Sequence, residues 1–488
     1  MEHDPHYSLG SRAYRAMVDN GFSPDLSPEV IGQVHQIELA TQVSGGHPSM
    51  QDLRSLLWSS IDNDDSRDLD QLEVAEALPN GRIRLMVGIA DVDAVVSQNT
   101  PIDRHASDNT ISVYTGVRTF PMLPEALSHD STSLIQGTDR AAIVTDMEID
   151  RDGTVQSSKI FPALVHNHAR LTYDEVGPWL EGRANAPVGV ANTTGMEAQL
   201  RLQAQAAERL YSQRVQNGAL EFDTVEARPI VTDGQVVDLA VPPKNLARRM
   251  IENFMIAANT TMASLLESRG VPSIQRVVRS PQRWPRIVEL AVRLGESLPP
   301  DPDPRALSTF LAKRKQADPI HFPDLSLSIV KLMGPGEYTV VKSVFEHAGH
   351  FGLAVYSYTH STAPNRRFAD VVVQRLLKAL NQGVNPPYSE EDLNAIAAHC
   401  TERENAARKV ERLMRKVVAA ALMSDRIGQS FSAIVTGASE KGTYVRLLAP
   451  PVEGRVVHGE DGLDVGDRVH VRLIDTDPNR GFIDFACG

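Results

Sequence analysis

Cysteine is nearly absent from this chain of 488 residues, and long apolar runs are lacking altogether. Two cysteines, Cys400 and Cys487, are too few for a disulfide framework or a cysteine-rich zinc site, so they predict a reducing compartment. No apolar run approaches the length of a membrane span, and the N-terminus has neither the basic nor the apolar region of a signal peptide. We therefore expect a cytoplasmic protein that does not act at a membrane.

Positive charge is also in deficit, because 49 lysines and arginines face 62 aspartates and glutamates, for a formal net charge of −13. This balance argues against a protein that simply coats nucleic acid, since such binding depends on neutralising phosphates with lysine and arginine. It leaves room for an enclosed basic channel. Cations are concentrated in two places, residues 366–378 and residues 403–416.

Hydrophobic periodicity divides the chain into three regions. Helical patterns at 12–19 and 28–41 predict a small N-terminal segment, residues 1–48, with a helix-turn-helix-like form as one option. Residues 49–425 begin with strand patterns (82–92, 141–149 and 155–165) and continue with helical patterns from residues 196, 246, 366 and 389. Five short strand patterns between 431 and 485 predict an OB-type barrel at 426–488. The expected fold class is α+β.

The most unusual stretch is acidic, with five aspartates between Asp62 and Asp70. Closely packed carboxylates raise one another's pKa unless a cation neutralises them, so an acidic cluster that leads into a strand indicates a site for Mg²⁺ or Mn²⁺. Asp68 and Asp70 would share one face of an extended segment, and Asp62 could close the site from the preceding loop. The alternative for such a run is a solvated acidic loop.

Further motifs follow the acidic stretch in a fixed order: IADV at 89–92, SVY at 112–114, FPMLP at 120–124, LTY at 171–173, IENFMIAAN at 251–259, HFGL at 350–353 and YTHSTAPNRRFAD at 358–370. Together they resemble the RNB-domain exoribonucleases of the ribonuclease II and ribonuclease R group. Asp62, Asp68 and Asp70 match three of that family's four metal-binding aspartates, and Gln71 stands at the fourth position.

The resemblance also assigns the domains. Residues 49–425 would be an RNB catalytic domain, and the C-terminal barrel is similar to an S1 domain, the RNA-binding OB variant that ends these enzymes. The start of the chain departs from the family, because the segment 1–48 is too short for the two cold-shock barrels that usually precede the catalytic domain.

An activity follows from the same resemblance: processive hydrolysis of single-stranded RNA from the 3′ end, with release of nucleoside 5′-monophosphates. Its metal would be Mg²⁺ or Mn²⁺ on Asp62, Asp68 and Asp70. Arg366 would contact the scissile phosphate, and the alternative is a surface pair with Asp370. The expected partner is the 3′ end of single-stranded RNA. No protein partner is identifiable, so we expect a monomer.

Other positions in the family's motifs contact the RNA, and this sequence matches them at Tyr114, Tyr173, Phe222, Glu252, Arg367 and Glu411. Aromatic residues make up only 5% of the chain, so rings at motif positions are informative, although each of the three could instead belong to the core. Glu411 could equally form a surface ion pair one helical turn away.

Two alternatives remain open. Loss of the fourth aspartate at Gln71 would fit a non-catalytic RNA-binding pseudo-enzyme. A neutral amide still offers a carbonyl oxygen to a hard cation, however, and Asp64 or Asp65 could supply charge, so we expect measurable activity. His347 and His350 could ligate zinc, but no third ligand follows at suitable spacing, which favours structural histidines.

Overall fold

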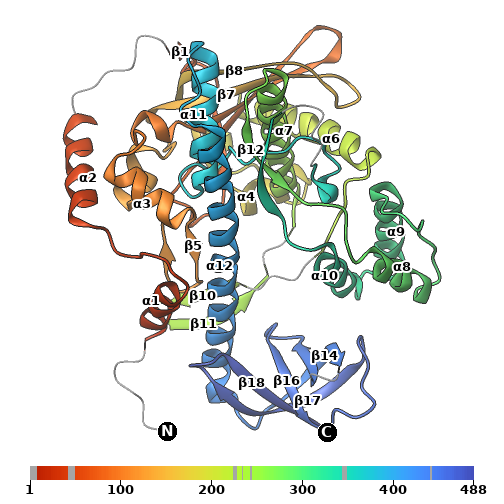
Figure 1. Cartoon of the computed structure of the whole chain (residues 1–488). Helices are drawn as coiled ribbons and strands as arrows, with labels where there is room; N and C mark the ends of the chain where they lie inside the picture. The colour runs from red at the N-terminus through yellow and green to blue at the C-terminus, as the bar shows by residue number, and fades with distance from the viewer. Residues whose placement is uncertain are drawn as a thin grey trace.

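A mixed sheet of seven strands forms the centre of the protein (Figure 1). The computed structural model describes residues 8–41, 50–223, 228–232, 235–241, 244–342, 349–439 and 442–488. In spatial order the strands are β1 (Gln51–Asp52), β8 (Val155–His166), β7 (Asp139–Ile149), β4 (Ile83–Ala90), β3 (Gln71–Ala77), β2 (Ser59–Asp62) and β9 (Ala169–Thr172). The inner pairs are antiparallel, and the edge strands β1 and β9 pair in parallel.

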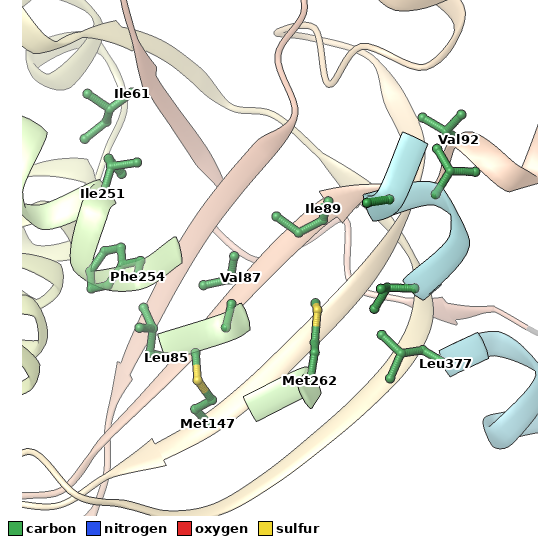
Figure 2. Packing of buried hydrophobic residues seen from close by; sticks show 14 of the residues in the cluster. Ile61, Leu85, Val87, Ile89, Val92, Met147, Ile251, Phe254, Met262 and Leu377 are labelled. Atoms are coloured by element: carbon green, nitrogen blue, oxygen red, sulfur yellow. The ribbon is translucent and has the colours of Figure 1, made fainter. Parts of the chain in front are cut away.

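Both faces of this sheet are covered. On one face, Leu85 and Val87 of β4 pack against Phe254 and Met262 of α7 (Leu246–Ser268) (Figure 2). On the other face, a second cluster surrounds Trp58. Because β4 is buried on both sides, its sequence is nearly continuously apolar rather than alternating.

The remaining helices surround the sheet or extend from it. They are α3 (Pro101–Asn109), α4 (Tyr173–Leu180), α5 (Val188–Asn192), α6 (Met196–Gln216), α8 (Trp284–Arg293), α9 (Pro304–Ala317), α10 (Phe322–Met333), α11 (Phe368–Gln382) and α12 (Glu390–Met423). Three two-stranded antiparallel sheets accompany them: β5 (Val113–Tyr114) with β6 (Thr119–Phe120), β10 (Arg228–Thr232) with β11 (Gln235–Ala240), and β12 (Ser273–Val277) with β13 (Glu337–Val341). Helices α8, α9 and α10 share a separate apolar cluster around Trp284.

The proline-rich stretch at 298–304 is a loop except at its last residue. Pro304 opens α9, and the Asp303 side chain caps the helix by accepting the N–H groups of Arg305 and Ala306. A proline costs nothing at the first helical position, because its missing N–H would have no partner there.

Two helices precede the sheet. The first, α1 (Leu9–Asp19), packs against α12 through Ala13, Ala16 and Met17, whereas α2 (Pro28–Thr41) lies beside α3. The two N-terminal helices therefore have different neighbours in the large domain.

The long helix α12 leads to a closed C-terminal barrel (Figure 1). Ser389 and Asp392 form a reciprocal capping box at the start of α12. The barrel strands are β14 (Ser430–Ser439), β15 (Gly442–Leu447), β16 (Glu453–His458), β17 (Arg468–Asp477) and β18 (Phe482–Cys487). The expected α+β class with a five-stranded C-terminal barrel is confirmed. None of the helices in the described part of the chain is long and apolar enough to cross a membrane.

A buried ion cluster joins α11 to the segment that follows β4. Arg375 is 3% exposed at its side chain and lies 2.7 Å from Asp93 and 2.8 Å from Asp103, and it also donates to Tyr388. Lys378 contacts Asp93 at 2.8 Å. Each charge in the cluster is compensated by a neighbour, so loss of one cation leaves carboxylates that are buried without full compensation.

We expect Arg375→Met to lower the free energy of unfolding by about 3–5 kcal/mol, because Asp103 keeps its burial and loses its cation. The same change at Arg279, which is 63% exposed and pairs with Glu337, should cost no more than about 1 kcal/mol. Urea denaturation of both variants measures the difference. Equal stability of the two variants would contradict this reading of the cluster.

Candidate active site

The acidic loop connects two neighbouring strands of the sheet. Asp62 is the last residue of β2, and Asp70 directly precedes β3, which pairs with β2. Between them, the Ser66 hydroxyl donates to Asp62 at 2.9 Å, and Arg170 binds the backbone carbonyls of Asp64 and Ser66 at 2.8 Å. The loop is thus fixed at both ends and in its middle.

Asp70 is the most deeply buried aspartate of this loop, at 4% exposure. Its carboxylate accepts the backbone N–H of Asn365 at 3.1 Å and lies 3.8 Å from the Arg366 guanidinium. Burial raises the pKa of Asp70 to about 8, even though the Arg366 charge acts in the opposite direction. Burial also raises the pKa of Asp62, and the nearby Asp68 charge adds to the effect. Burial thus favours the protonated forms of both carboxyl groups, and a bound cation would favour their ionised forms.

Arg366 and Arg367 contact different carboxylates. The Arg367 guanidinium binds Asp370 with two contacts, at 2.9 and 2.8 Å, and Asp370 also accepts the Ala363 N–H. Because Asp370 is occupied in this way, the surface pair considered for Arg366 does not form. The Arg366 side chain is 42% exposed and directed to Asp70.

Tyr114 and Glu411 come to the same place from distant parts of the chain. The Tyr114 hydroxyl donates to Asp68 at 3.3 Å, and the Tyr114 N–H donates to Glu411 of α12 at 3.2 Å. Burial of the hydroxyl and then the Asp68 charge raise the pKa of Tyr114. Tyr114 is nevertheless 44% exposed, so its ring is available to a ligand.

Tyr173 lies on the Asp62 side of the site, at the start of α4. Burial raises its pKa, and the charges of Asp62 and Glu73 raise it further. The Arg248 guanidinium covers its ring at 4.5 Å and donates to Asn63 in the acidic loop at 3.1 Å. Arg248 is a site residue that the sequence did not reveal, because it matched no motif.

Gln71 and Glu73 share the face of β3 that is turned to the helices, away from Asp70. Gln71 is 8% exposed, and its amide reaches the Ile61 carbonyl at 3.5 Å. Glu73 is fully buried, and neither of its carboxylate oxygens has a hydrogen-bond partner among the described residues. Burial and the Asp62 charge raise its pKa well above the usual value. The sequence did not reveal that Glu73 is buried, because alternation along the strand predicts that a polar residue at this position faces water.

Two of the expected RNA-contacting residues have other surroundings. Phe222 packs against the cluster of α8, α9 and α10, and its carbonyl accepts Lys244. Glu252 is exposed on α7, and its charge acts on Arg214.

His350 accepts the Leu353 N–H and has its pKa lowered by burial to about 4, whereas His347 lies outside the described residues.

In the parts of the chain that the structure describes, no three histidine, cysteine, aspartate or glutamate side chains converge closely enough to hold one metal ion. The donor chemistry is nevertheless that of a hard cation, with carboxylates and an amide. It fits an ion bound by one or two carboxylates and completed by substrate phosphate and water, which is how Mg²⁺ is commonly bound.

Comparison with known proteins places these segments in one family. The RNB domain matches residues 50–383, and the RNase II-type exonuclease C-terminal S1 domain matches residues 429–487. Ribonuclease R 1 of Lactococcus lactis is 32% identical over 406 residues, which are 81% of this chain and 48% of that protein. Ribonuclease R of Thermotoga maritima is 32% identical over 83% of this chain and 57% of its own length. The chain thus spans about half the length of these curated relatives.

A solved structure of Mycoplasma genitalium RNase R in complex with ribose-methylated single-stranded RNA has the same fold. It superimposes with a TM-score of 0.87 over 99% of this chain and 78% of that one, at 22% sequence identity. At this level of identity the likeness supports the fold alone.

The raised pKa of Asp70 predicts a pH-dependent stability. Between the usual aspartate pKa near 3.9 and the folded value of about 8, the native state binds the extra proton, so the free energy of unfolding falls as pH rises. In metal-free buffer, Asp70→Asn removes this titration. The free energy of unfolding of the variant minus that of the wild type should therefore be larger at pH 8 than at pH 5, by at least about 1.4 kcal/mol. Urea titrations at both pH values test this, with exposed Asp64→Asn as control. A constant difference would contradict it.

Proposed function

Because this chain belongs to the RNB-domain family, we propose that it is a processive exoribonuclease that hydrolyses single-stranded RNA from the 3′ end and releases nucleoside 5′-monophosphates. The observation that carries the proposal is the convergence of Asp70, Arg366, Tyr114 and Glu411 from four distant segments at one partly exposed place. Ribonucleases R of similar sequence agree with it, although the chain spans only part of their length.

The proposed site is dependent on a divalent metal, Mg²⁺ or Mn²⁺, with Asp62, Asp68 and Asp70 as carboxylate ligands. Such an ion withdraws charge from a phosphate and activates water. The chain's own contribution is to hold the carboxylates: Ser66 orients Asp62, and the Asn365 N–H orients Asp70. Burial raises the pKa of Asp62 and Asp70, and a divalent cation at the site would stabilise their ionised forms.

Arg366 would bind the scissile phosphate. Its guanidinium is planar and half-exposed, its neighbour Arg367 is already bound to Asp370, and its contact with Asp70 at 3.8 Å leaves donors for a phosphate. Tyr114 would stack on a base close to that phosphate, and stacking of this kind contributes about 1–3 kcal/mol per base without reading sequence.

The remaining assignments are proposals of the same kind. From the family's motif positions, Tyr173, Phe222, Glu252, Arg367 and Glu411 would also contact the RNA, although Phe222 packs against the cluster of α8, α9 and α10 and Arg367 is bound to Asp370. The domains would be an N-terminal helical segment at 1–48, the catalytic domain at 49–425 and an S1 domain at 426–488. The substrate would be the 3′ end of single-stranded RNA, bound by a monomer in the cytoplasm.

The decisive experiment is incubation of the purified protein with a 5′-labelled single-stranded RNA, with and without Mg²⁺ or Mn²⁺. We expect stepwise shortening from the 3′ end and release of 5′-mononucleotides, and we expect Asp70→Asn to lower turnover by at least about 10²-fold while RNA affinity is kept. Full activity of Asp70→Asn at saturating Mg²⁺ would contradict the metal assignment.

Gln71 decides between this proposal and the rival, a pseudo-enzyme that binds RNA without turnover. We expect the wild type to be active. The Gln71 amide is buried on the helix-facing side of β3, so its presence leaves the Asp70 carboxylate in place. Gln71→Asp should change the metal concentration that gives half the maximal rate more than it changes the maximal rate itself. A wild type that is inactive with every divalent ion, together with an active Gln71→Asp, would establish the rival.

A further inference from the structure

Helix α12 carries a basic face that the proposed active site does not use. The α12 basic face consists of Lys409, Arg412, Arg415 and Lys416, all exposed. Lys409, Arg412 and Lys416 follow at spacings of three and four residues, and Arg415 lies three residues after Arg412, so the four side chains share one side of the helix. They lie in the half of α12 that leads toward the barrel (Figure 1).

The charges of this face form no ion pairs within the described part of the chain. The acids of the same stretch of α12 are engaged elsewhere, since Glu404 binds Arg276 and Arg408, and Glu411 accepts the Tyr114 N–H. Like charges three or four residues apart destabilise a helix. In a chain with a net charge of −13, an uncompensated basic face therefore calls for an anionic partner.

The fold does not need these cations. The opposite side of α12 is the one that packs, with Ala407, Val410, Met414 and Val417 buried against α1. None of the four basic residues belongs to that cluster or to any other buried cluster of the described chain. They can be replaced without opening the core.

The face is continuous with the active site at one end and with the barrel at the other. Glu411, which holds the Tyr114 backbone, is one helical turn from Arg415. At the far end, a Cβ at Gly481 would lie 2.7 Å from the Lys416 Cβ, so the turn between β17 and β18 rests directly on the helix. That turn adds Arg480, whose side chain is 73% exposed. From Lys409 to Lys416 the helix rises about 10 Å.

We propose that the α12 basic face binds the phosphates of the RNA segment between the active site and the barrel, so that the helix, and not only the barrel, holds the substrate strand. This inference rests on the proposed function for its ligand. A flexible row of lysine and arginine side chains, with no aromatic residue among them, recognises backbone phosphates and not bases. Binding along the face is therefore independent of RNA sequence.

The test compares two variants of equal charge. One replaces Lys409, Arg412, Arg415 and Lys416 by glutamine, and the control replaces the exposed Arg283, Arg286, Arg293 and Lys331, on or next to α8 and α10. Both are made in an Asp70→Asn background, so that binding is measured without cleavage. Fluorescence anisotropy follows the affinity for a five-nucleotide and a twenty-five-nucleotide single-stranded RNA over a range of salt concentrations.

We expect the face variant to lose at least about tenfold in affinity for the long RNA and much less for the short one. The plot of log affinity against log salt should become shallower by about 0.7 for each phosphate contact removed, and the control should follow the parent. Equal losses in both variants, or equal losses for both RNA lengths, would overturn the inference. If the face variant binds the long RNA as tightly as the parent does, the inference is wrong.

The two proposals fail separately. If the parent protein binds long RNA through the face but the wild type never shortens RNA, the proposed function is wrong and this inference stands. A wild type that degrades RNA, with a face variant whose binding equals that of the control, would overturn this inference alone.

Discussion

The burial of the Asp70 carboxylate is the constraint on which the site depends. A charge at 4% exposure is costly unless opposite charge and hydrogen bonds surround it. Here the Asn365 N–H and the Arg366 guanidinium supply them, and both come from a segment almost 300 positions later in the chain. The acidic loop and the segment at 363–370 therefore stabilise each other. Burial outweighs the Arg366 charge and leaves Asp70 with a raised pKa, so a bound cation would replace the proton that burial favours on its carboxylate.

Helix α12 gives this site its second support. It fixes Tyr114 through Glu411, binds Arg276 through Glu404, and continues without interruption to the barrel. One rigid element thus links a residue in contact with Asp68 to the C-terminal domain. Helix α1 packs on the side of α12 that is opposite the α12 basic face.

Much of this architecture could be predicted from the sequence, because the signals were local. The bounds of α7, α11 and α12 follow from helical periodicity and from glycines or a capping box at their ends, and the barrel strands follow from alternation. Pairings between distant side chains could not be predicted. Periodicity cannot say which of two adjacent arginines binds Asp370, and the structure gives this task to Arg367. Phe222 matched a motif position, yet its packing against the cluster of α8, α9 and α10 depends on helices for which the sequence made no prediction.

Gln71 and Glu73 explain each other in the same physical terms. Both point to the helix-covered face of β3, where Glu73 is fully buried and its carboxylate oxygens accept no hydrogen bond from any residue that the structure describes. A second carboxylate at position 71 would lie on that same face, next to Glu73 and close to Asp62, whose pKa is already raised. Each buried like charge adds repulsion that only a cation or a proton relieves. A neutral amide at position 71 avoids this repulsion, and its contact with the Ile61 carbonyl uses the donor that a carboxylate lacks. A strand that already carries the buried Glu73 can thus accommodate a neutral glutamine at position 71. The buried surroundings of this position account for the residue as much as the chemistry of the site does.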